Sequence, residues 1–229
     1  TLKVNNLQKR DGTALITDGA ASTTLLSKTA LKNANVGMIL LEEKDVASGS
    51  AAAQPFHFQN IFSSTYRTYK AIYTVKETES QANNTNCGLI VRLGTGGTLS
   101  TGTSSTVKHS LHYIRADQTT NSVVYGDSDD LLVFCQNFSN NEDMLAMGSC
   151  EFHNFQTADI PAFSISDTIM HGSSNTDYFE KGHNILGNNN NFTDVSFEIK
   201  VGGGGGGGNM DYTTTGYNVF GNVKIYGII

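Results

Sequence analysis

The chain has 229 residues, enough for one large β domain or for a modest domain with an arm. Charged residues make up 16% of it and hydrophobic residues 38%, which excludes a charge-rich disordered chain and a coiled coil. The formal net charge of −6 argues against a nucleic-acid backbone as a partner.

Residues 1–35 differ in composition from the rest of the chain. They contain no aromatic residue, and they combine short apolar pairs such as Leu15–Ile16 with the turn signals Asp11–Gly12 and Asp18–Gly19. A segment of this kind cannot bury a core of its own. We therefore interpret residues 1–35 as an extended N-terminal arm that is either disordered or ordered against a partner, and residues 36–229 as the folded domain.

From Met38 onward the pattern predicts strands. Short runs of apolar, β-branched and aromatic residues recur between turn-forming segments, with two prolines in the whole chain and no convincing long helix. These features predict an all-β fold, an antiparallel β-sandwich or jelly roll. The predicted strands cover residues 38–41, 66–75, 89–93, 107–115, 131–138, 145–155, 163–169, 195–201 and 221–229.

The closing strand alternates apolar and polar side chains. Val219, Val223 and Ile225 are apolar, and Asn222 and Lys224 between them are polar. A period of two predicts one face on a core and one face in water. We expect these last residues to be structural.

The three cysteines, Cys87, Cys135 and Cys150, are odd in number and form no Cys-x-x-Cys pair. This pattern suggests neither a disulfide framework nor a zinc site, and it predicts buried free thiols in a reducing compartment. We expect no signal peptide, because residues 2–6 form no apolar region, and no run approaches the ~20 apolar residues of a membrane helix. We expect synthesis in a cytoplasm and no membrane insertion.

Several residue patterns resemble those of chemical sites. Gly94–Gly97 follows a strand, but no helix follows it, so a loop between strands is favoured over a phosphate site. His109 and His112 have an odd separation and should point to opposite faces of a strand.

The acidic cluster Asp127, Asp129 and Asp130 favours a solvated turn, with a calcium site built from several loops left open. No Gly-x-Ser-x-Gly elbow occurs, and paired acids of a glycosidase cannot be recognised from spacing in a β fold. We predict no catalytic residue, no metal ligand and no cofactor.

The late loops carry the remaining signals. Seven glycines, Gly202 to Gly208, predict a flexible hairpin loop or an extended backbone packed against another chain. Tyr178, Phe179, Tyr212 and Tyr217 lie in loop-like surroundings rich in Asn, Asp, Thr and Gly. Such aromatic residues indicate recognition loops or contacts with a neighbouring subunit.

Three segments, in order along the chain, resemble one family. Leu2–Gln8 followed by Asp11–Gly12–Thr13 resembles an "LKVNxIQxxxG" start, and Ile61–Tyr73 is similar to an "IxSTYxxYxIxF" segment. Lys224–Ile228 matches a closing "KIYGI". The pattern is that of bacteriophage appendage proteins, especially of marine phages: tail fibres, head fibres and capsid decorations.

The resemblance implies a non-enzymatic virion protein, made in the host cytoplasm and commonly trimeric. It implies that the arm docks on other capsid or tail proteins and that the β domain contacts a host-surface glycan or protein. The expected docking residues are Leu2, Val4, Leu7, Leu15 and Ile16. A capsid decoration that stabilises the head is the alternative, and a glycan-binding or glycan-cleaving β domain is a lesser one.

Overall fold

The computed structural model describes fourteen segments of the chain: residues 7–8, 14–17, 20–21, 37–47, 56–77, 86–99, 107–115, 121–128, 131–138, 144–156, 160–172, 176–186, 191–202 and 219–228. The chain divides into a small unit, residues 1–39 with 228–229, and a large unit, residues 40–227. The two units are described separately.

The small unit contains a three-stranded antiparallel sheet. Its strands are β1 (Leu7–Gln8), β2 (Ala14–Thr17) and β3 (Ala20–Ala21), hydrogen-bonded in the order β1-β2-β3. Leu7 is paired with Ile16, and Ile16 with Ala21. The predicted arm therefore contains short strands, whereas the predicted boundary at residue 35 lies outside the described residues.

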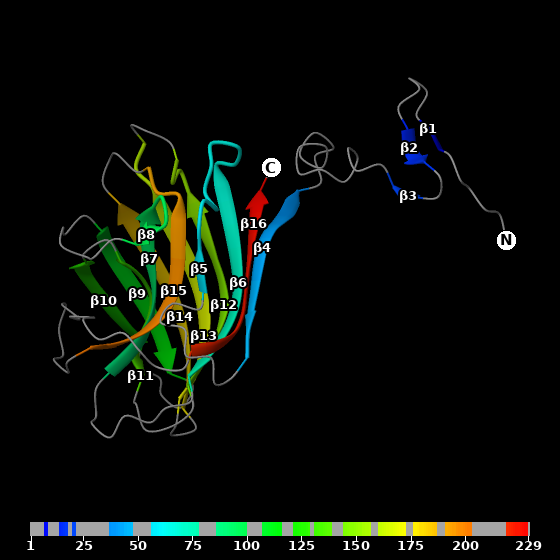
Figure 1. Cartoon of the computed structure of the whole chain (residues 1–229). Helices are drawn as coiled ribbons and strands as arrows, with labels where there is room; N and C mark the ends of the chain where they lie inside the picture. The colour runs from blue at the N-terminus through cyan, green and yellow to red at the C-terminus, as the bar shows by residue number, and fades with distance from the viewer. Residues whose placement is uncertain are drawn as a thin grey trace. The chain divides into compact units, whose positions relative to one another are not determined.

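The other strands form two larger antiparallel sheets (Figure 1). One has eight strands in the order β10-β9-β14-β13-β12-β6-β16-β4, and the other has five, β11-β7-β15-β5 with β8 added beside β7. Their bounds are β4 (Met38–Val46), β5 (Phe56–Phe58), β6 (Thr68–Glu77), β7 (Asn86–Thr95), β8 (Thr98–Leu99), β9 (Val107–Arg115), β10 (Asn121–Ser128), β11 (Leu131–Phe138), β12 (Met144–His153), β13 (Phe163–Gly172), β14 (Thr176–Leu186), β15 (Asp194–Gly202) and β16 (Val219–Ile228).

The two sheets face each other across an aromatic core. The Tyr73 ring on β6 lies 5.7 Å from that of Phe197 on β15, and the Phe134 ring on β11 lies 6.1 Å from that of Phe152 on β12. All four side chains are at most 1% exposed. The predicted all-β antiparallel sandwich is confirmed, and no helix occurs in the described segments.

Tyr73 also joins two strands that are not neighbours. Its hydroxyl forms a 2.6 Å hydrogen bond with the Thr168 hydroxyl on β13. Gly148 on β12 is the register partner of both residues. Because Gly148 has no side chain, the Tyr73 hydroxyl can reach across β12.

The closing strand β16 behaves as its alternation predicts. Val223 and Ile225 are fully buried, whereas Asn222 and Lys224 are partly exposed. Gly227 lies against the ring of Tyr66, where an added Cβ would be 2.7 Å from ring atoms. The strand lies between β6 and β4 in the eight-stranded sheet.

Two strands, Val107–Arg115 and Leu131–Phe138, have the bounds that the sequence predicts. The sequence predicts neither the strands β5, β8, β10 and β14 nor the short strands β1–β3 of the small unit. Asp127 lies on β10, at the register position of Lys108, instead of in a turn, while Asp129 and Asp130 are outside the described residues. The segments that the structure describes contain no helix long and apolar enough to cross a membrane.

Cys150 is a buried free thiol, as predicted, whereas the side chains of Cys87 and Cys135 are outside the described set. Burial raises the pKa of the Cys150 thiol well above its usual value, with a smaller contribution from Glu151.

We expect iodoacetamide at pH 8 to leave Cys150 unmodified in the native protein and to alkylate it after denaturation, because the thiolate is the reactive form. Peptide mass spectrometry checks this, and rapid native labelling would contradict the burial.

The Tyr73–Thr168 bond gives a second prediction. Tyr73→Phe should lower the free energy of unfolding by about 1–2 kcal/mol, because it removes a hydroxyl that bonds the buried Thr168. Urea denaturation measures the change. Tyr226→Phe, at a half-buried position on β16, is the matched control. Equal effects of the two substitutions would show that the hydrogen bond adds nothing.

Candidate functional site

The predicted docking residues fall in the small unit. Leu7 lies on β1, and Leu15 and Ile16 lie on β2. Leu2 and Val4 are outside the described residues. The backbone pairing of Leu7 with Ile16 brings two of the five predicted positions together.

The predicted recognition aromatics require a correction. Tyr178 and Phe179 lie on strand β14, and not in a loop, whereas Tyr212 and Tyr217 are outside the described residues. The inward face of β14 carries Glu180 and Asn184, which are 1% and 0% exposed. Polar residues on the buried face hide the alternation that would have predicted a strand.

Phe179 belongs to a row of apolar side chains on the outer face of the eight-stranded sheet. The backbone register pairs Phe179 with Ile114 on β9 and with Ile169 on β13. Ile169 is paired in turn with Met147 on β12. The apolar row therefore consists of four residues on four adjacent strands: Ile114, Phe179, Ile169 and Met147.

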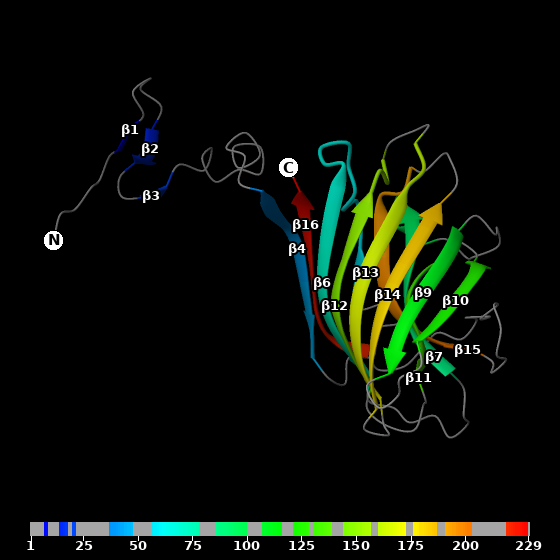
Figure 2. The ribbon, with the colours of Figure 1, turned by 180° about the vertical axis from the view of Figure 1, so that it is seen from behind.

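All four members of the apolar row are exposed. The exposed fractions are 48% for Ile114, 45% for Phe179, 48% for Ile169 and 37% for Met147. Figure 2 looks onto this face of the sheet, and no other labelled strand lies in front of it. Single exposed apolar residues are common, but a contiguous exposed group indicates a contact surface.

The same face has further apolar and charged side chains. Ile72 on β6 and Ile185 on β14 are 41% and 56% exposed. Lys181 is 3.5 Å from Asp167, a residue paired with it across β13 and β14. Lys70 is 3.6 Å from Glu151 on the neighbouring strand. The charges of these two ion pairs are thus matched locally, next to the apolar row.

The histidines of β9 confirm the prediction of opposite faces. His109 is 6% exposed on the inner side, whereas His112 is exposed. The His112 ring lies 6.2 Å from that of His183 on β14, in an edge-to-face arrangement. No group of three or more His, Cys, Asp and Glu residues suited to a metal ion occurs in the part of the chain that the structure describes.

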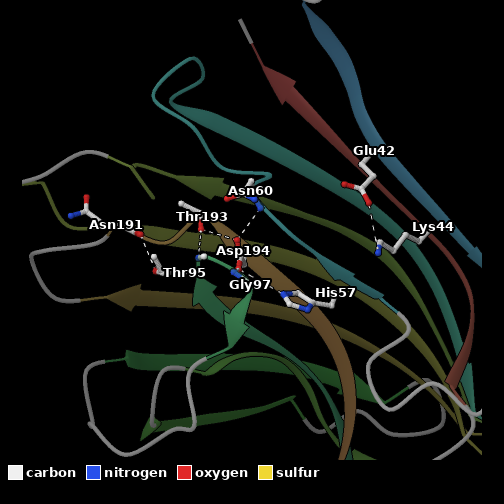
Figure 3. Close-up of polar contacts among 10 residues, drawn as sticks. Glu42, Lys44, His57, Asn60, Thr95, Gly97, Asn191, Thr193 and Asp194 are labelled. Carbon is white, nitrogen blue, oxygen red and sulfur yellow. Dashed lines mark hydrogen bonds and ion pairs between the residues drawn. The ribbon is translucent and has the colours of Figure 1, made fainter.

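A second cluster surrounds Asp194, the first residue of β15 (Figure 3). The backbone N–H of Asn60 donates to Asp194 Oδ1 at 2.8 Å, and the Thr193 hydroxyl donates to the same oxygen at 2.7 Å. The N–H of Gly97 donates to Oδ2. The carboxylate therefore ties the connection between β5 and β6 to the turn between β7 and β8.

This turn requires glycine. Gly96 and Gly97 have φ values of +62° and +88°, and they connect the paired residues Thr95 and Thr98. Two successive residues of positive φ form the two-residue hairpin turn that follows the twist of the strands. The Gly94–Gly97 segment is thus a strand end and a tight hairpin, which agrees with the predicted loop between strands.

Asp194, His57 and Ser196 have the residue types of a hydrolytic triad. His57 Nε2 is 3.9 Å from Asp194 Oδ2, and Ser196 is the register partner of His57. In a triad, the serine hydroxyl bonds one ring nitrogen and the carboxylate bonds the other. The buried Ser196 hydroxyl makes no hydrogen bond in the described part of the chain, and the Asp194 oxygens are occupied by structural donors. The geometry fits a structural role, in which the Asp194 carboxylate holds Asn60 and Gly97 together. We call this arrangement the Asp194 clamp.

The hydrogen bonds determine the charge state of Asp194. Burial by itself would raise the pKa of this carboxyl. The donors Asn60, Thr193 and Gly97, with a contribution from His57, outweigh burial and hold the pKa below its usual value.

Comparison of the chain with protein-family models, with curated proteins and with solved structures finds no match.

Asp194→Asn should lower the free energy of unfolding by about 1–3 kcal/mol at pH 7, because the new amide places a donor opposite a donor. The folded-state pKa is lower than that of the unfolded chain, so the unfolded state takes up more protons as pH falls. The stabilisation is present above the usual carboxyl pKa of about 3.9 and is lost as pH falls through the lower folded value.

Denaturation of wild type and variant at a series of pH values measures this difference. Asp45→Asn, at an exposed position on β4, is the control. A difference between wild type and Asp194→Asn that stays constant down to the lowest pH at which both fold would contradict the clamp.

Proposed function

We propose that this chain is a non-enzymatic surface protein of a bacteriophage particle. In this proposal, the N-terminal arm docks on the particle and the β-sandwich is presented for macromolecular contact, as in a fibre. The apolar row carries the contact part of the proposal, because it places exposed apolar side chains on four strands of a sheet whose other face packs against a second sheet.

The resemblance to phage appendage proteins supports the particle part of the proposal. Two of the three resembling segments, Ile61–Tyr73 and Lys224–Ile228, are brought together by the fold. Tyr66 from the first packs on Gly227 from the second, and strands β6 and β16 are neighbours. The two segments, which are far apart in the sequence, thus contact each other in the fold.

The exposed face gives specific support to the alternative, a capsid decoration. A fibre should bury mainly its arm on the particle, whereas a decoration should bury much of its β domain. A broad sheet face with an apolar row could supply such a buried surface. Both alternatives place the protein on a virion, and the copy number separates them.

Quantitative mass spectrometry of purified particles, calibrated against the major capsid protein, tests the proposal. A copy number comparable to that of tail proteins supports a fibre, and one comparable to that of the capsid protein supports a decoration. Absence of the chain from particles would overturn the virion function.

The arm can be tested in the same assay with the full chain. Leu15→Asp together with Ile16→Asp should remove most of the protein from particles, because charged side chains weaken apolar docking. Ile160→Asp, at a 43% exposed position outside the small unit, should leave incorporation unchanged. Full incorporation of the arm variant would show that docking occurs elsewhere.

A further inference from the structure

We propose that the outer face of the eight-stranded sheet is a self-association surface, covered by the same face of a second copy of this chain. The surface is centred on the apolar row, Ile114, Phe179, Ile169 and Met147. This inference goes beyond the proposed function, because it applies to the purified protein whether or not it is part of a particle.

Strands β13 and β14 have an inverted pattern that indicates burial of both faces. On β13, the inward residues Ser164, Ser166 and Thr168 are at most 1% exposed, whereas Ile165 and Ile169 point outward. The buried Ser166 hydroxyl makes no hydrogen bond within the described segments. A sheet with polar residues inside and isoleucines outside loses hydrophobic stabilisation unless its outer face is also covered.

The size of the face suits a protein partner. Strands β9, β14, β13, β12 and β6 have nine to eleven residues each. At ~4.8 Å between strands and ~3.3 Å per residue, they present a face of roughly 24 by 33 Å, or about 800 Å². A stable protein–protein interface buries about 800 Å² on each partner.

The charges of the face favour a second copy over a partner of opposite charge. The chain carries a formal net charge of −6, so two copies repel each other at long range. On this face, however, Lys181 pairs with Asp167 and Lys70 pairs with Glu151. Because the charges of these two pairs are matched within one copy, they oppose the approach of an identical face only weakly.

The row is also self-complementary in geometry. The row runs across the strands. A two-fold axis that lies midway between two stacked sheets, either parallel or perpendicular to the row, places the row of one copy against the row of the other. Facing sheets pack about 10 Å apart with interdigitated side chains. Isoleucine, phenylalanine and methionine side chains fill such a space without unpaired polar groups. A sugar ligand would require polar partners, which the row lacks.

Sedimentation equilibrium over a range of concentrations, with the full chain, tests the proposal. Wild type should show an oligomer, with a dimer at twice the chain mass of 24.6 kDa. Phe179→Thr and Ile169→Thr each place threonine, a residue that favours strands, in the row and should raise the dissociation constant at least about tenfold. Ile160→Thr, at an exposed isoleucine outside the row, is the control and should associate like wild type.

Oxidation of Met147 provides a readout without substitution. Hydrogen peroxide should oxidise Met147 several-fold more slowly at high protein concentration than after dilution, because association covers its thioether. Met38, which is 44% exposed on β4, three strands away from β12, should show no such dependence.

The proposal is supported if the wild-type oligomer dissociates when Phe179 or Ile169 is replaced, and if Met147 is protected from oxidation at high protein concentration. A wild-type monomer at all concentrations overturns it and assigns the face to another partner, such as a capsid neighbour or a host molecule. An oligomer that survives both row substitutions also overturns it, since another surface then mediates association. Neither result bears on incorporation into particles, which tests the proposed function separately.

Discussion

The sandwich depends on how Tyr73 is held between its two sheets. Its ring packs against Phe134 and Phe197 of the five-stranded sheet, while its hydroxyl bonds Thr168 two strands away in its own sheet. Gly148, the register partner of both Tyr73 and Thr168, has no side chain between them. A single side chain thereby contributes apolar area between the sheets and satisfies a buried hydroxyl.

The polar character of this inner face has a consequence for the outer one. Strands β13 and β14 place serine, threonine, glutamate and asparagine inside, so their isoleucines and Phe179 lie outside. Burial of those apolar side chains is a source of free energy that the isolated sandwich does not use. Contact with another molecule would bury them, which is the physical basis of the proposed self-association. The polar residues around Asp194 have a different role. Their types suggest catalysis, but the hydrogen bonds of Asp194 hold two connections between strands together.

Much of the fold followed from local pattern. The alternation of Val223 and Ile225 with Asn222 and Lys224 predicted the buried face of β16, and the odd spacing of His109 and His112 predicted their opposite exposure. The bounds of β9 and β11 were also predicted, and β11 begins with the continuous apolar run Leu131–Cys135. These features depend on backbone periodicity, which any half-buried strand imposes on its own sequence.

The sequence by itself therefore determined the all-β class, most strands of the sandwich and the buried thiol of Cys150. Only the tertiary structure decided that Thr176–Leu186 is a strand, because its inward polar residues are buried by neighbouring strands and leave no hydrophobic period. Only strand order and register decided that Ile114, Met147, Ile169 and Phe179 form one row. Positions so far apart in sequence become neighbours through hydrogen bonds between strands, and those pairings cannot be read from any local stretch of the chain.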